Sequence, residues 1–169
     1  MREQAYKLVR DGEYSSALKL LNNMIESDPS DWNSIYLAGQ CCRHLGDIGG
    51  AISRLKRATE ICPNESPVWL GLGIAHQLRS NWNEAISAIK IALEIDPDYV
   101  LAFNSLAFTQ RKMNELAKAE HNYDAGIKAL ARCIIKNMEN TFDGEIVPSR
   151  LTKSELWVEH VMYAALYIA

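Results

Sequence analysis

Apolar residues over roughly the first 135 positions form short helical stripes that are interrupted at regular intervals. Over 35–42, small and apolar residues recur three and four positions apart, the spacing of an amphipathic helix. Turn formers follow at 46–47, a second stripe covers 48–59, and Pro63 closes the unit, because proline cannot continue a helix. The pattern therefore predicts pairs of antiparallel helices joined by a tight turn.

Three sets of residues recur every 34 positions, which marks a stacked repeat. The first set is Ala17, Ala51, Ala85 and Ala119, the second is Ala5, Gly39, Gly73 and Ala107, and the third is Pro29, Pro63 and Pro97. The small residues let the two helices of a hairpin approach closely, and bulkier side chains there would cost about 1–3 kcal/mol through overpacking. Each hairpin needs neighbours, since one alone cannot bury both of its faces.

This arrangement resembles the tetratricopeptide repeat, and the third unit carries the fullest match. Its Trp69, Leu72 and Gly73 are spaced as in the family's W-x-x-L-G stretch. The resemblance covers about residues 1–135 as four repeats, although Ala131 stands where the fourth closing proline would fall. It implies an all-α fold, a right-handed α-α superhelix of antiparallel helix hairpins, whose first helices line a concave groove that binds peptides or helices of partner proteins.

The candidates for this groove lie on the side of each first helix opposite the small-residue contact. They are Tyr36, Gln40 and Arg43 in the second unit, Leu70, Ile74 and Gln77 in the third, and Leu101, Asn104, Phe108 and Arg111 in the fourth. An apolar strip flanked by amide and guanidinium donors suits an amphipathic helix or an extended apolar peptide. The alternative for Leu70, Ile74 and Phe108 is burial between repeats, because a helical stripe does not mark its own outer limit.

Some members of the family hold the C-terminal carboxylate of heat-shock chaperones with a clamp of Lys, Asn and Arg. The matching positions here are Arg2, Tyr6, Leu37, Pro67 and Gly71 in one window of three repeats, and Tyr36, Gln40, Gly71, Leu101 and Ser105 in the other. Neither window supplies the clamp. We therefore expect no chaperone co-factor activity of that type.

The pattern changes after Ala131, where the missing proline lets the last helix continue to about Asn140. The predicted organisation is four repeats over 1–135, a helix extension and linker over 136–151, and a C-terminal helix over 152–169. That helix opens on a capping box, Thr152-Lys153-Ser154-Glu155. Its apolar positions for self-packing or oligomerisation include Trp157, Val161, Met162 and Leu166. Four roles fit it: a cap on the array, an occupant of the groove, a dimer contact, or the first helix of a further repeat.

Composition excludes several classes of partner and compartment. The formal net charge is −3 and the basic residues are scattered, so we expect no nucleic-acid partner. No apolar run approaches the roughly 18–20 residues of a membrane span, and no secretory signal opens the chain. The four cysteines form no C-x-x-C pair, which favours reduced thiols and a cytoplasmic location.

The motifs of common catalytic sites are missing from the chain. No two of the four histidines have i, i+4 spacing, and neither a phosphate loop nor a G-x-S-x-G elbow occurs. We expect no enzyme activity, no catalytic residue, no metal and no cofactor. The predicted function is a protein–protein interaction scaffold that binds a partner peptide or helix in its groove. One alternative is a self-assembly module that forms a homodimer or larger homo-oligomer through the apolar C-terminal helix. The other is a regulatory or docking segment of a larger protein.

Overall fold

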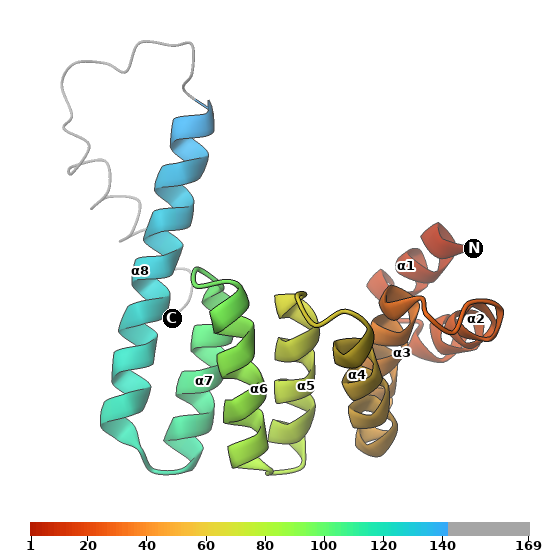
Figure 1. Ribbon diagram of the computed structural model, residues 1–169, viewed down its shortest axis with the longest axis horizontal. Coiled ribbons are helices and arrows are strands. Elements are labelled where there is room, and N and C mark those ends of the chain that lie inside the picture. The colour runs from red at the N-terminus through yellow and green to blue at the C-terminus, as the bar shows by residue number, and fades with distance from the viewer. Residues whose placement is uncertain (142–169) are drawn as a thin grey trace.

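The computed structural model describes residues 1–141, which form eight helices in four hairpins (Figure 1). The hairpins are α1 (Arg2–Arg10) with α2 (Tyr14–Ser27), α3 (Trp32–His44) with α4 (Ile48–Ile61), α5 (Ser66–Leu78) with α6 (Trp82–Ile95), and α7 (Val100–Lys112) with α8 (Leu116–Thr141). The hairpins stand side by side in chain order, from α1 at one end to α8 at the other (Figure 1). The predicted all-α solenoid of helix hairpins is confirmed.

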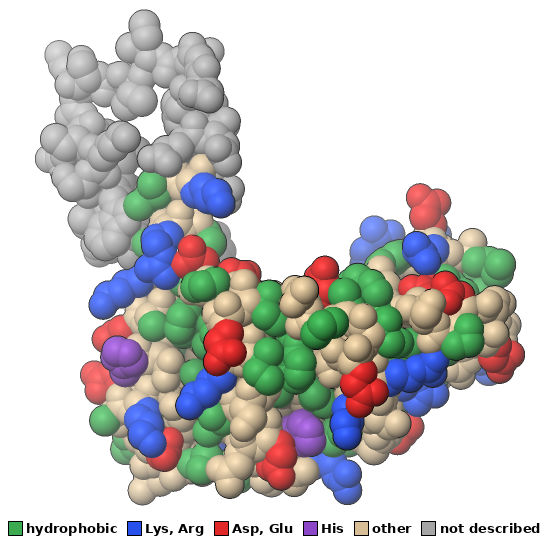
Figure 2. All heavy atoms as spheres, in the orientation of Figure 1, with side chains coloured by type: hydrophobic (Ala, Val, Ile, Leu, Met, Phe, Trp, Pro, Cys, Tyr) green, Lys and Arg blue, Asp and Glu red, His purple; other side chains and the backbone are tan. Residues whose placement is uncertain are grey.

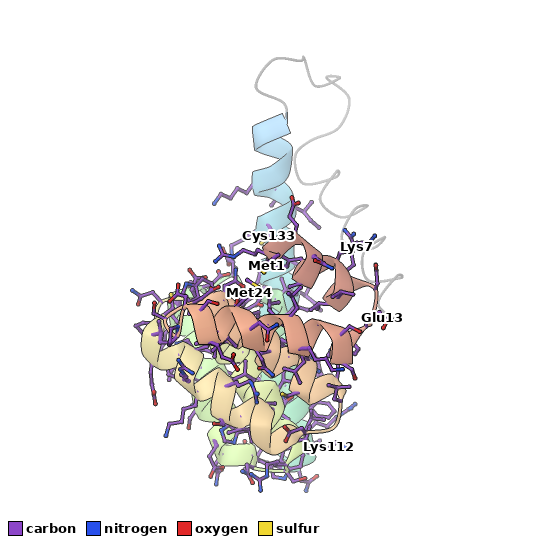
Figure 3. All side chains as sticks on the ribbon, turned by 90° about the vertical axis from the view of Figure 1, so that its right-hand side faces the viewer. Met1, Lys7, Glu13, Met24, Lys112 and Cys133 are labelled. Carbon is purple, nitrogen blue, oxygen red and sulfur yellow. The ribbon has the colours of Figure 1, made fainter. Side chains whose placement is uncertain are left out.

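Every turn within a hairpin contains one residue with a left-handed backbone. These residues are Gly12, Gly46, Ser80 and Asn114, again 34 positions apart, with φ between 60° and 83°. The turns also share a hydrogen-bond pattern: the amide after the left-handed residue donates to a carbonyl five positions earlier, as from Asp47 to Cys42. Seen from the α1–α2 end, Lys112 at one such turn lies at the opposite edge of the array from Cys133 (Figure 3).

The small residues lie where the two helices of a hairpin touch, as the period predicts. Ala17, Ala51 and Ala85 are fully buried. A Cβ added to Gly73 would lie 2.6 Å from Ile89 Cγ1 and 3.3 Å from the Ala85 carbonyl oxygen. Because that space is already filled, glycine is needed there for the helices to pack.

The first helices of the hairpins lie on the inner side of the curved array. Within the described chain, α3 contacts α5 and α5 contacts α7, whereas no comparable contact joins α2 to α4 or α4 to α6. The second helices of successive hairpins are therefore farther apart than the first helices. This difference makes the surface of the first helices the inner face.

The last helix is longer than the others. α8 has 26 residues against 14 in α2, α4 and α6, and its end rises beyond the body of the array (Figure 1). It continues past Ala131, the position without a closing proline. The remainder of the predicted linker and the predicted helix over 152–169 lie outside the described residues.

Candidate partner-binding surface

The repeat spacing and partial exposure assign one side chain near the middle of each first helix to the inner face, and we call these four the inner row. The inner row is Tyr6, Gln40, Ile74 and Phe108, spaced by 34 residues. Tyr6 is 41% exposed and the other three are half-buried. The inner row is thus accessible along the described array.

Close contacts between α3 and α5 show how this face is built. A Cβ added to Gly71 would lie 2.9 Å from Gln40 Nε2 and 3.3 Å from Tyr36 Cε2. Burial raises the pKa of the Tyr36 hydroxyl, so this side chain stays neutral. Arg43 Nε donates to Gln40 Oε1 at 2.9 Å, which fixes the amide at the centre of the second hairpin's inner surface.

The third hairpin divides its predicted groove residues between surface and interior. Ile74 is half-buried on the inner row, but Leu70 is only 4% exposed and packs in a core cluster with Ala102 and Leu106 of the next first helix. Gln77 Nε2 donates to the Ser105 carbonyl at 2.9 Å and to Thr109 Oγ1 at 2.7 Å. Leu70 and Gln77 therefore join α5 to α7 and offer little to a partner.

The fourth hairpin has the most open part of the inner face. Leu101 is 60% exposed, and Asn104 and Arg111 are exposed while Phe108 is half-buried. The Arg111 guanidinium carbon lies 5.9 Å from the centroid of the Phe108 ring, and Lys112 Nζ lies 5.5 Å from it. Cation–π attraction at these distances holds two positive charges beside an accessible aromatic ring.

The sequence-based set misses Tyr6 and Lys112. The hydroxyl of Tyr6 accepts a hydrogen bond from Asn33 Nδ2 of the second hairpin, and a hollow of about 610 Å³ lies along α1 beside Glu3, Tyr6, Lys7, Val9 and Arg10. The 34-residue spacing from Gln40 back to Tyr6 is the signal that extends the face to α1. Lys112 is the residue after Arg111 and belongs to none of the predicted groove positions, so the repeat spacing does not identify it.

The rows on the inner face carry charge of one sign. They comprise Asn33, Pro67 and Leu101; Arg2, Tyr36, Leu70 and Asn104; the inner row; and Val9, Arg43, Gln77 and Arg111. All three charged members are arginines, although the whole chain has a net charge of −3. Arg2 is paired with Asp31 at 3.1 Å, which leaves Arg43, Arg111 and the adjacent Lys112 as the cations nearest the apolar part of the face.

Charge elsewhere on the molecule is mixed. The face drawn in Figure 2 shows Lys and Arg side chains interspersed with Asp and Glu, without a large field of either sign. Over the described residues, no group of three His, Cys, Asp or Glu side chains is placed to hold a metal ion. The helices of residues 1–141 include none that is both long and apolar enough to cross a membrane.

The self-packing positions predicted in the C-terminal helix cannot be placed on this surface. Trp157, Val161, Met162 and Leu166 all lie outside the described residues.

Comparison with known families agrees with the period, the turns and the close helix contacts. A family model described as tetratricopeptide repeat matches residues 8–74. Residues 8–74 belong to the tetratricopeptide repeat family. The match covers most of the first two repeats and the start of the third, and the same hairpin geometry continues through α8.

The curated relatives that this chain matches are longer proteins. It is 27% identical over 117 residues to the BBSome complex member BBS4 of Bos taurus, covering 69% of this chain and 22% of that protein. It is 24% identical over 102 residues to an N-terminal acetyltransferase A complex subunit-like protein of Schizosaccharomyces pombe, covering 60% and 15% respectively. The chain thus spans under a quarter of the length of either relative.

Solved structures share the repeat fold at low sequence identity. MamA from Desulfovibrio magneticus RS-1 superposes with a TM-score of 0.71 at 16% identity, over 84% of this chain and 75% of that one. The first tetratricopeptide repeat domain of Spaghetti (RPAP3), bound to the HSP90 peptide SRMEEVD, gives a TM-score of 0.64 at 19% identity, over 66% and 89%. These similarities establish the fold.

Proposed function

We propose that this chain is an interaction scaffold whose inner face binds a segment of a partner protein, and that the segment is both apolar and acidic. The observation that carries the proposal is the cluster on α7: Leu101 is 60% exposed, and Phe108 is half-buried with Arg111 and Lys112 within 6 Å of its ring centroid. An apolar side chain of the partner gains by covering Leu101 and Phe108, at about 25 cal/mol per Å² of buried apolar area. A neighbouring carboxylate gains from the two cations.

The electrostatics of the inner face support an acidic partner. A carboxylate entering it meets no like charge on the four rows, whereas a basic segment would face Arg43, Arg111 and Lys112. Like-charge contacts suppress wrong partners, and opposite charges speed the encounter. The proposed affinity therefore depends on ionic strength.

Related proteins support the scaffold class. The RPAP3 domain binds a peptide, SRMEEVD, that contains two glutamates beside apolar residues. Two relatives are named as a member of the BBSome complex and as a subunit-like protein of an acetyltransferase complex. We propose that this chain likewise works by holding another protein and carries out no reaction itself. A free C-terminal carboxylate is not the proposed ligand, because the positions of the carboxylate clamp hold other residues.

Two further proposals concern the setting of this scaffold. The chain covers only 12–22% of the length of its curated relatives, which supports a docking segment of a larger protein as the second candidate function. We also propose a reducing, cytoplasmic compartment, which the free thiols of Cys41 and Cys42, buried in the second hairpin, support.

A capture experiment tests the scaffold proposal. The wild-type chain and the double variant Ile74→Asp/Phe108→Ala are used to capture proteins from native lysate, and bound proteins are identified by mass spectrometry. We expect specific partners with the wild type and their loss with the double variant, which removes the apolar strip. Unchanged far-UV circular dichroism shows that the variant remains folded.

Matched control variants distinguish specific binding at the inner face from non-specific binding elsewhere on the surface. Ile61 is 38% exposed at the end of α4, and Ile61→Asp should retain all specific partners. Arg111→Glu with Lys112→Glu should weaken capture, whereas Lys90→Glu on α6 should not. An identical set of partners for the double variant and the Ile61 control would refute the proposal.

A further inference from the structure

Among residues 1–141, nothing covers the face of α8 that is equivalent to the covered faces of α2, α4 and α6. Leu21, Leu55 and Ile89 are fully buried, whereas Tyr123, the equivalent residue 34 positions after Ile89, is 36% exposed. In a hairpin that is followed by another, this position packs against the first helix of the next hairpin. Leu55, for example, shares a core cluster with Leu72 of α5. No such helix follows α8 within residues 1–141.

Further apolar side chains extend this open face along α8. Leu116 is 60% exposed and Ile127 is 53% exposed, and Ile134 is half-buried. With Tyr123 they are spaced by seven, four and seven residues, so they lie on one stripe of the helix. We call these four residues the α8 stripe. At 1.5 Å per residue, the α8 stripe is about 27 Å long from Leu116 to Ile134.

We propose that residues 152–169 of the same chain dock on the α8 stripe as a helix, in the place that the first helix of a further repeat would take. The sequence of this segment fits that position. Eight of its apolar positions fall within one arc of about 160° on a helical wheel. They are Trp157, Val158, Val161, Met162, Ala164, Ala165, Ile168 and Ala169. Glu155, Glu159 and His160 fall outside this arc, together with Leu156, Leu166 and Tyr167, so the opposite side of the helix is mixed in polarity.

Length and connection favour this segment over a second copy of the chain. A helix of 18 residues is about 27 Å long, which equals the length of the α8 stripe. Ten residues, 142–151, connect the two elements and span at most about 33–36 Å, whereas an antiparallel start beside Ile134 lies only about 10 Å back along α8 from Thr141. A short tether of this kind gives an effective concentration on the order of millimolar, which a second copy must exceed to compete.

Hydrogen exchange and light scattering on the full chain test the proposal. We expect a monomer in which the amides of 156–168 are protected from exchange. Val161→Lys, in the segment, and Ile127→Lys, on the α8 stripe, should each accelerate exchange of those amides by at least about tenfold. Ile61→Lys is the control and should leave exchange unchanged, since Ile61 is an exposed isoleucine on α4, away from the α8 stripe.

Three outcomes would overturn the proposal. A wild-type dimer that becomes a monomer in Val161→Lys assigns the α8 stripe to a second copy. Protection of 156–168 that survives Ile127→Lys and is lost in Ile74→Lys assigns the segment to the inner face. Unprotected amides over 156–168 in the wild type exclude a docked helix. None of these measurements depends on partner capture, so the proposal and the proposed function can fail separately.

Discussion

The third and fourth hairpins share one sequence period but have different environments. Ile89 of α6 is fully buried because α7 covers it, whereas Tyr123 of α8 is 36% exposed. The period thus determines which residues can be buried, and the following first helix determines which residues are buried. The exposure of a side chain in such an array therefore depends on the helices packed around it, and its match to the repeat pattern does not determine it.

The helix–helix contact within each hairpin also differs between the two central hairpins and the two terminal hairpins. The second and third hairpins have Gly39 and Gly73 there, while the first and fourth have Ala5 and Ala107. A Cβ at Gly39 would lie 2.8 Å from Leu55 Cγ, but Ala107 is accommodated and fully buried in the fourth hairpin. At this contact, the second and third hairpins are therefore packed more tightly than the first and fourth.

The largest expected effect comes from truncating the same repeat position in the two environments. Leu55→Ala should lower the free energy of unfolding by about 2–5 kcal/mol, because it leaves a cavity in a fully buried cluster. Tyr123→Ala should cost less than that but more than the about 1 kcal/mol of a partly solvated side chain, because the proposed docking of residues 152–169 covers Tyr123. Urea unfolding followed by circular dichroism measures both. A loss of about 1 kcal/mol or less for Tyr123→Ala would show that the α8 stripe is uncovered and would contradict the docking.

A smaller effect is expected from adding one methyl group inside the third hairpin. Gly73→Ala should lower the free energy of unfolding by about 1–3 kcal/mol, because the new Cβ overlaps Ile89. Gly49→Ala on α4 is the matched control, since its Cβ would come no closer than 3.8 Å to Asp47 Oδ1. That control should gain about 0.5–1 kcal/mol from helix propensity. Stabilisation by both substitutions would contradict the tight contact.

The response to acid should differ between His76 and its fourth-unit equivalent, Gln110. Gln110 Oε1 accepts from Asn122 Nδ2 at 2.8 Å, whereas His76 Nδ1 is buried with no hydrogen-bond partner among the described residues. Burial lowers the pKa of His76, with Glu84 opposing and Arg79 adding to the shift. The unfolded chain therefore binds the proton more readily, so stability falls as the pH drops through about 6.5, the value of free histidine.

Replacement of the histidine tests this pH dependence. His76→Gln copies the fourth unit and should flatten the loss of stability between pH 7 and pH 5, measured by urea unfolding across that range. His121, which is exposed on α8, provides the control variant His121→Gln. An equal slope in wild type and His76→Gln would exclude this histidine as the source.

The last comparison concerns the rates at which the cysteine thiols are labelled, and it is expected to perturb the fold least. Cys41 and Cys42 of the second hairpin are at most 1% exposed, and burial raises the pKa of Cys41 to about 11, so both should react slowly with an aromatic disulfide reagent at pH 8. Cys133, half-buried on α8, should react at least about tenfold faster than either. Mass spectrometry of labelled peptides assigns each thiol. Early labelling of Cys41 would indicate opening of the second hairpin.

The sequence predicts the fold well because the repeat is local and frequent. Alanines and glycines at fixed intervals mark the contacts within hairpins, and prolines mark the boundaries between them. The left-handed turn residues follow the same period, yet Ser80 and Asn114 lack the glycine that identifies Gly12 and Gly46. A sequence search for turn glycines alone therefore finds only two of the four turns.

The inner face is less predictable because its rows border the contact between successive first helices. Tyr36, Leu70 and Asn104 occupy one row, but Leu70 is buried by α7 while Asn104 is exposed beside α8. Periodicity assigns these three residues to one side of a helix. Their exposure depends on the size of the side chains opposite, such as Gly71 next to Tyr36, which a single helical stripe does not encode.

Binding of an identified partner to matched variants tests the central claim most directly. Isothermal titration of the partner captured by the wild type is repeated with Ile74→Asp/Phe108→Ala, with Arg111→Glu/Lys112→Glu, and with the Ile61→Asp control, at low and at high salt. The inner-face account predicts that affinity falls at least about tenfold in both double variants, falls with salt in the wild type, and is unchanged in the control. Full, salt-independent affinity in the two double variants would contradict it.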